Sequence, residues 1–293
     1  MLVNDLIVNF TPTGMIPTKE MTPHVPVTVD EVVDDVRRAW EIGITMVHLH
    51  ARNQQTGAPA WEAGIYADMI AGIREFAPEL IICVSTSGRN FNEFEKRAAA
   101  LFLEGNLKPD MGSLTLSSLN FNRVASVNAP EMITDLAIEM RRRGIKPELE
   151  AFDAGMINYA QYLLDKKILT PPCYFNLLLG NIACAQADLL HAGIMVRDLP
   201  CDSFWSFAGI GEFQLRMNSI AIAVGGGVRV GLEDNIWFNS ARTRLATNME
   251  LLERVHGIAA ANGRGVMSAE AMRNKLGLYD GRNAYGCPPW SSG

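Results

Sequence analysis

The sequence predicts a single (β/α)8 barrel, the TIM-barrel fold of the α/β class. Short apolar runs rich in β-forming residues alternate with longer amphipathic stretches, and the pairs recur about every 30–40 residues, as in repeated βα units around a parallel sheet. Eight such pairs fit into the 293 residues of the chain. Single barrels commonly reach about 250 residues, so one large domain accounts for the length. Eight alternating units favour a closed barrel over an open sheet.

Each expected strand is an apolar run that a helical pattern follows. The eight strands are expected at residues 6–11, 46–51, 81–85, 111–116, 148–152, 174–179, 203–208 and 228–232. A capping box, Thr28-Val-Asp-Glu31, opens the first helix, and Gly43 suits its end. Another helix opens at Asn128-Ala-Pro-Glu131 and ends at Gly144. Between residues 181 and 200 the helical pattern is short and interrupted.

The barrel domain is expected to span residues 1–278, followed by a C-terminal tail at 279–293. The tail is rich in Gly, Pro and aromatic residues. We expect it to have no part in the barrel and to lie on a neighbouring subunit or to be mobile.

Composition excludes several classes of function. A net charge of −6 and the absence of any Lys/Arg run argue against nucleic acid as a partner. The N-terminus lacks an export signal, and no segment approaches the ~18 apolar residues of a membrane span. The five cysteines are scattered and never spaced Cys-x-x-Cys, which favours reduced packing residues and a cytoplasmic protein.

The end of the second strand carries two histidines. Side chains alternate along a strand, so His48 and His50 share one face, which points into the barrel if Val47 and Leu49 face the helices. Reactive groups of such barrels lie at the carboxyl ends of the strands. A hydrogen-bonded pair of core or surface histidines is the alternative. Neutral imidazole suits zinc, and a catalytic zinc usually has three protein ligands.

A carboxylate on the last strand is the best candidate for the third ligand. The other histidines lie in a long loop or on expected helices. In the last strand Arg229, Gly231 and Glu233 share one parity and the aliphatic residues share the other. The sequence therefore predicts a divalent cation, expected to be zinc, bound by His48, His50 and Glu233.

Several further residues lie at the level of the mouth. Gly209 and Gly211 follow a strand and open a helix, so they predict either a cofactor-binding site for an anionic group or a tight turn without ligand. Ser85 and Ser113 end the third and fourth strands, where hydroxyls could donate to a substrate carboxylate. Glu148 and Glu150 share a face of the fifth strand and are either site groups or ion-pair partners of arginines.

These residues resemble those of the β-keto acid cleavage enzyme family. This family includes the 3-keto-5-aminohexanoate cleavage enzymes. The resemblance runs from about residue 6 to residue 275. The segments that carry it are Thr13-Gly14, Pro26-Val27-Thr28, Val47-His-Leu-His-Ala-Arg52, Ser85-Thr86, Lys108-Pro-Asp-Met111, Ser113-Leu114, Asn120-Phe121, Pro147-Glu-Leu-Glu150 and Arg229-Val-Gly-Leu-Glu-Asp-Asn235.

The resemblance implies an acyltransferase that reacts a β-keto acid with acetyl-CoA to give acetoacetate and a new acyl-CoA. It places zinc on His48, His50 and Glu233, and the catalytic base on Asp234 with Arg229 beside it. It also implies substrate-binding roles for residues at the ends of the third and fourth strands. These are Ser85, Gly88 and Ser113, and Glu150 is a further candidate for substrate binding from its place on the fifth strand. Resemblance and apolar C-terminal helices favour a homodimer or homotetramer.

One departure concerns the substrate. The aminohexanoate enzymes carry a glutamate two residues after the Thr-Gly pair, suited to a substrate ammonium, where this chain has Ile16. The departure predicts a substrate that is not cationic, with an uncharged or apolar acyl portion.

Other classes remain as alternatives. A metal-dependent aldolase or lyase of the hydroxymethylglutaryl-CoA lyase type also has a His-x-His strand, but late in the barrel and with an early aspartate. An amidohydrolase would need further histidine ligands. A non-catalytic small-molecule binder would be favoured only by a closed metal site.

Overall fold

The strands form the closed parallel barrel that the sequence predicts. The computed structural model describes residues 5–289. Around the barrel, the order is β1 (Val8–Phe10), β10 (Gly227–Val230), β9 (Ser203–Gly209), β8 (Cys173–Leu179), β7 (Lys146–Ala151), β4 (Met111–Thr115), β3 (Ile81–Val84) and β2 (Met46–Leu49), which returns to β1. Each barrel strand overlaps one expected run, so the predicted fold class is confirmed.

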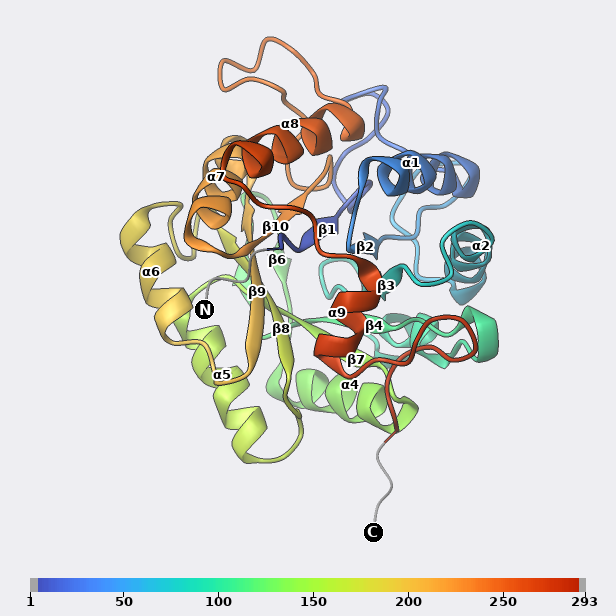
Figure 1. Cartoon of the computed structure of the whole chain (residues 1–293). Coiled ribbons are helices and arrows are strands. Elements are labelled where there is room, and N and C mark those ends of the chain that lie inside the picture. The colour runs from blue at the N-terminus through green and yellow to red at the C-terminus, as the bar shows by residue number, and fades with distance from the viewer. Residues whose placement is uncertain (1–4, 290–293) are drawn as a thin grey trace.

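Helices surround the ring of strands (Figure 1). They are α1 (Val29–Ile42), α2 (Ala63–Arg74), α3 (Phe94–Arg97), α4 (Pro130–Arg143), α5 (Ala154–Asp165), α6 (Leu189–Arg197), α7 (Gln214–Val224) and α8 (Asn248–Ala261), whereas α9 (Ala269–Leu276) lies across one end of the barrel. The capping box of α1 is formed as expected, by Thr28 and Glu31. The third unit departs from the pattern, because the four-residue α3 is continued only by short 3-10 turns at Ala99–Phe102 and Gly105–Leu107.

The amino-terminal end of the barrel is closed by α9. Met272 and Leu276 pack against apolar residues of the strands, among them Met46 and Ile81. Arg273 donates to both carboxylate oxygens of Asp110, at 2.9 and 2.8 Å, and both side chains are buried. This helix therefore forms a floor that seals the barrel opposite the predicted site.

The described part of the tail packs against the same chain. The Gly286 N–H donates to Asp110 at 2.9 Å, and the Cys287 N–H donates to the carbonyl of Gly144 at 2.8 Å. The guanidinium carbon of Arg74 lies 3.2 Å from the ring centre of Tyr285. The tail was expected to have no part in the barrel and to lie on a neighbouring subunit or to be mobile, but its described residues pack on this chain, where Gly286 donates to Asp110 and Cys287 packs against the apolar cluster of the floor. Residues 290–293 lie outside the described part.

One feature of the fold was not predicted. A small antiparallel hairpin, β5 (Leu119–Asn120) with β6 (Ala125–Ser126), follows β4 at the mouth.

Within residues 5–289 no helix combines the length and apolar character needed to span a membrane.

Candidate active site and metal centre

The structure brings the three predicted metal ligands together at the mouth of the barrel. His48 is on β2, His50 directly follows it, and Glu233 follows β10, the strand on the other side of β1. The Nε2 atoms of the two histidines lie 3.1 Å apart, and Nε2 of His50 lies 3.1 Å from Oε1 of Glu233. Two strands that are distant in sequence thus supply one compact group of ligand atoms.

The geometry of these atoms fits a divalent cation. Bonds of about 2.0–2.1 Å at tetrahedral angles put zinc ligands roughly 3.3 Å apart, close to the 3.1 Å separations found here. The second carboxylate oxygen of Glu233, Oε2, is buried and has no hydrogen-bond partner. An unpartnered buried carboxylate oxygen is costly, and a cation would satisfy it. Two imidazoles and a carboxylate form a donor set that zinc accepts.

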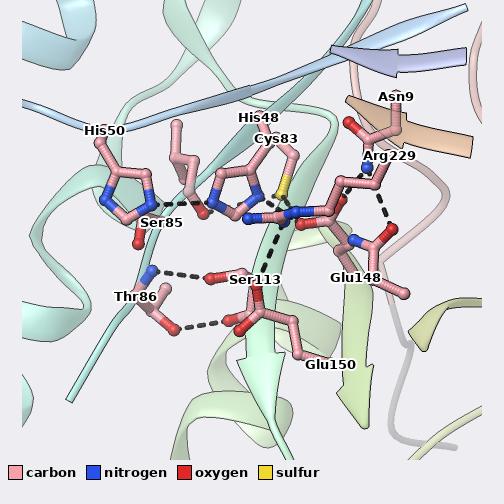
Figure 2. Close-up of polar contacts among 12 residues, drawn as sticks. Asn9, His48, His50, Cys83, Ser85, Thr86, Ser113, Glu148, Glu150 and Arg229 are labelled. Atoms are coloured by element: carbon pink, nitrogen blue, oxygen red, sulfur yellow. Dashed lines mark hydrogen bonds and ion pairs between the residues drawn. The ribbon is translucent and has the colours of Figure 1, made fainter. Parts of the chain in front are cut away.

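Glu148 fixes the orientation of His48. Its Oε2 lies 2.5 Å from Nδ1 of His48, so Nε2 of the imidazole faces the ligand group (Figure 2). Its Oε1 accepts from Asn9 at 2.6 Å. Burial raises the pKa of Glu148, but the charge of His48 and its hydrogen bond outweigh burial and hold the pKa at about 2. A carboxylate behind a ligand histidine is a common arrangement in metal sites.

Cys83 lies behind His48, beside Glu148. Its Sγ donates to Oε2 of Glu148 at 3.1 Å, and the ligand atoms of both residues lie near those of His48. Burial, together with the charge of Glu148, raises the pKa of the thiol well above its usual value. Cys83 therefore supports the carboxylate that orients His48.

Arg229 connects the acidic groups of the mouth. Its guanidinium lies 2.6 Å from Glu233, 3.0 Å from Asp234 and 3.4 Å from Glu150. The arginine and Asp234 are both buried. Burial is the largest influence on Asp234 and raises its pKa to about 6, although Arg229 acts in the opposite direction. The predicted base is therefore a buried carboxylate held beside the metal ligand.

The loop after β1 approaches Glu233 so closely that only glycine fits. Gly14 has a φ of +64°, and a Cβ there would lie 2.4 Å from Cγ of Glu233. Arg52 holds this loop by donating to the carbonyls of Gly14 and Pro17, each at 2.8 Å. The conformation of the loop thus restricts the position of Glu233, the predicted third ligand.

A small hollow adjoins His50 and reaches the residues after β3. Ser85 and Met15 contribute to its wall. Ile16, which was expected to form an apolar wall, is 51% exposed. The backbone turn at residues 14–16 presents Met15 to the hollow and directs Ile16 outward. Met15, and not Ile16, therefore supplies the apolar side chain of this loop to the wall of the hollow.

Of the predicted substrate residues, Ser85 lines this hollow, whereas Gly88, Ser113 and Glu150 make their contacts elsewhere at the mouth. The hydroxyl of Ser113 accepts from the Thr86 N–H at 3.1 Å, and Thr86 donates to the Ser113 carbonyl at 2.5 Å (Figure 2). Gly88 leaves room for the hairpin, since a Cβ there would lie 2.4 Å from the Val127 carbonyl. Glu150 accepts from Thr115 at 2.7 Å and faces Arg229. It is a member of the ionic network at the mouth.

Gly209 and Gly211 have the geometry of a tight turn. Gly209 ends β9, and a Cβ there would lie 2.2 Å from the Phe213 carbonyl. The Gly211 N–H donates to the Asp234 carbonyl at 2.7 Å. Because this donor is already used, the predicted anion-binding role has no support from the geometry. The turn instead ties β9 to the residue after the metal ligand.

Comparison with known proteins identifies the relatives of the chain. The family model for beta-keto acid cleavage enzymes matches residues 5–278. The chain belongs to this family. It is 35% identical to a 3-oxoadipate:acetyl-CoA acetyltransferase of Cupriavidus necator, covering 97% of this chain and 98% of that protein. It is 34% identical to a 3-keto-5-aminohexanoate cleavage enzyme of Acetoanaerobium sticklandii, covering 89% and 94%.

Solved structures support the fold of this β-keto acid cleavage enzyme. The apo structure of ObcA superposes with a TM-score of 0.77 at 21% sequence identity, covering 87% of this chain and 66% of that one. The complex of ObcA with oxaloacetate gives a TM-score of 0.78 at the same identity. At this identity the likeness concerns the barrel alone.

Sequence reasoning missed some groups of the cleavage enzyme's site. Cys83 was treated as a packing residue, and Asn9 was not considered. Both lie on barrel strands at the parity that faces inward, like His48. A polar residue at an inward position of a barrel strand was the signal that could have identified them.

Proposed function

We propose that this enzyme is a zinc-dependent acyltransferase that converts a β-keto acid and acetyl-CoA into acetoacetate and a new acyl-CoA. The carboxymethyl fragment of the keto acid joins the acetyl group, and the remaining acyl portion leaves on CoA. The observation that carries the proposal is the convergence of His48, His50, Glu233 and Asp234 at one mouth in a chain that matches the family over residues 5–278.

His48, His50 and Glu233 would hold the zinc ion. A bound zinc supplies Lewis acidity, which polarises a carbonyl oxygen and favours enolate formation at the adjacent carbon. Glu148 keeps His48 in the orientation required of a ligand. Because Glu148, Asn9 and Cys83 surround His48 inside the barrel, this ligand is preorganised by residues that do not touch substrate.

Asp234 would remove the proton between the keto and carboxylate groups. A general base works best when its pKa is near the operating pH, and burial moves the pKa of Asp234 to about 6. Arg229 holds one carboxylate oxygen at 3.0 Å, which orients the base. The enolate carbon then attacks the thioester carbonyl of acetyl-CoA. The CoA thiolate that leaves this carbonyl adds to the keto carbonyl of the substrate. Retro-Claisen cleavage next to that carbon gives the new acyl-CoA and the enolate of acetoacetate, which takes a proton back from Asp234.

Ser85, Gly88 and Ser113 would bind the substrate carboxylate. Names of relatives include acids of different charge, such as 3-oxoadipate and 3-keto-5-aminohexanoate, so the family alone leaves the acyl portion open. We propose a substrate that is not cationic, because the loop after Gly14 offers Met15 and not a carboxylate to the hollow. The family match gives no support to the hydroxymethylglutaryl-CoA lyase alternative.

A cytoplasmic homodimer or homotetramer is also proposed. All five cysteines are free, in agreement with a reducing compartment. Leu189 and Leu190 at the start of α6 are each 71% exposed, and the nearby Ile182 is 68% exposed. Exposed apolar side chains of this kind mark surfaces that a partner subunit can cover.

An isotope experiment tests the reaction. Zinc-loaded protein is incubated with acetyl-CoA labelled with carbon-13 in the acetyl group and with a panel of β-keto acids, and products are read by mass spectrometry. The proposal predicts label in acetoacetate and none in the new acyl-CoA. Release of acetoacetate and acetyl-CoA from hydroxymethylglutaryl-CoA, with no acyl transfer from any keto acid, would indicate a lyase. Absence of any new acyl-CoA would reject the proposed function.

A further inference from the structure

Most cations at the mouth have their donors engaged by the protein. Arg52 donates to three backbone carbonyls. Arg97 donates to the carbonyls of Thr86 and Val127 and to Asn128. Lys96 pairs with a neighbouring glutamate at 2.7 Å. These contacts give each group a structural role.

Arg89 differs from these cations. It follows Gly88 in the loop after β3, and its guanidinium stacks 3.6 Å from the ring centre of Phe121 in the β5–β6 hairpin. Its Nε is buried and has no hydrogen-bond partner, and within residues 5–289 no carboxylate lies at ion-pair distance from it. Burial lowers the pKa of Arg89, opposed by the charges of Glu233, Glu150 and Asp234.

This arrangement suits recognition of a carboxylate. A guanidinium offers planar, paired donors that match carboxylate geometry, and stacking on an aromatic ring restrains it before the ligand arrives. A partly buried arginine without an anion loses hydration that a bound carboxylate would replace.

The position of Arg89 points to the far end of the substrate. Ser85 directly follows β3, whereas Arg89 lies four residues further along the loop and contacts a hairpin that itself stands beyond β4. The reacting keto and carboxylate groups lie near His50 and the ends of the strands. A group that reaches Arg89 belongs to the outer part of the acyl chain.

We propose that Arg89, stacked on Phe121, binds a carboxylate at the far end of the acyl portion, so that the preferred substrate is a β-keto dicarboxylic acid. This inference rests on the proposed function and narrows its substrate class. It also replaces the expectation of an uncharged acyl portion, which depended on Ile16 facing the pocket.

Specificity constants test the assignment. Zinc-loaded enzyme is assayed with a six-carbon β-keto dicarboxylate and with 3-oxohexanoate, its neutral-ended counterpart, and the ratio of kcat/KM is compared. Because hydrogen bonds to charged groups contribute about 1.5–3 kcal/mol, the wild-type ratio should exceed roughly tenfold. Arg89→Gln should reduce the ratio toward one, and Arg89→Lys should give an intermediate value. Arg123→Gln, an exposed charge change in the same hairpin, should keep the wild-type ratio.

The controls distinguish three anions as the ligand of Arg89: the carboxylate at the far end of the acyl portion, the phosphates of CoA, and the carboxylate that both acids share. An unchanged ratio in Arg89→Gln, with a higher KM for acetyl-CoA whichever acid is used, would assign Arg89 to the CoA phosphates and overturn the proposal. Equal losses for both acids would assign it to their shared carboxylate, with the same consequence.

A binding measurement keeps the inference independent of turnover. Calorimetry should show that adipate binds more tightly than hexanoate, and that Arg89→Gln removes the difference. If no acid yields an acyl-CoA, the proposed function fails, while this adipate preference would still support Arg89 as a carboxylate site. No adipate preference in the folded wild type would overturn it.

Discussion

Buried charged groups are hydrogen-bonded to different extents at the two ends of the barrel. At the floor, the carboxylate of Asp110 accepts from Arg273 and from the N–H groups of Ile82 and Gly286, so both of its oxygens are satisfied. At the mouth, Glu233 keeps one buried oxygen without a partner, and Arg89 keeps a buried nitrogen without one. Both ends contain ion pairs, but the carboxylate of Asp110 at the floor has a donor for each oxygen, whereas the carboxylate of Glu233 at the mouth has one oxygen without a donor.

The difference separates structural from functional charge. A fully satisfied network stabilises one arrangement, whereas an unsatisfied buried group costs free energy that a ligand can recover. The comparison assigns the floor to stability and the mouth to chemistry, in keeping with the division of roles in these barrels.

Asp234→Asn should give the largest loss. The amide can still accept from Arg229, but it cannot take a proton. General base catalysis typically contributes about 10²–10⁴-fold, so kcat should fall by that factor while zinc content stays unchanged. Steady-state kinetics with metal analysis measures both. A variant that retains more than a tenth of kcat would remove Asp234 from the base role.

A matched pair of glycine substitutions tests the position of Glu233. Gly14 and Gly57 have similar φ values, +64° and +69°, but a Cβ would strike Glu233 only at Gly14 and has nothing within 4 Å at Gly57. Since small misplacements can cost about 10²-fold, Gly14→Ala should lower kcat/KM by roughly that factor. Gly57→Ala should show the backbone strain alone, as a lower melting temperature. Equal effects on kcat/KM would contradict the contact.

Glu148→Gln tests the support of His48. The substitution keeps the shape but removes the carboxylate that faces Nδ1 of His48. Loss of such a supporting group typically weakens metal affinity about 10–100-fold. Competition with a zinc chelator measures the change. Unaltered affinity would mean that His48 needs no carboxylate for its orientation.

Asp110→Asn should affect stability and spare the site. It removes one charge of a buried pair and leaves Arg273 uncompensated, which costs about 3–5 kcal/mol. Urea unfolding measures the loss, and metal content under native conditions is expected to stay at the wild-type level. Loss of zinc from the folded variant would show that the two ends are coupled.

Periodicity was sufficient to predict the barrel, since each of the eight strands is a short apolar run between helical patterns. Parity along β2 and β10 was sufficient to choose His48, His50 and Glu233 as neighbours. Such inferences succeed because side-chain direction follows regular rules in a strand.

Loops and tertiary contacts were harder to predict. The orientation of Met15 and Ile16 depends on the left-handed turn at Gly14, which no periodicity encodes. The packing of the tail on Asp110 depends on partners more than 170 residues away in sequence. The stacking of Arg89 on Phe121 joins two loops whose approach only the folded barrel defines.

A bound metal ion at the mouth would establish the proposed zinc centre. Crystals of the zinc-loaded protein should show one anomalous peak per chain at the zinc absorption edge, within bonding distance of His48, His50 and Glu233. The peak should be lost in crystals of His50→Ala. A strong peak elsewhere, or none in protein that is catalytically active, would contradict the metal centre described here.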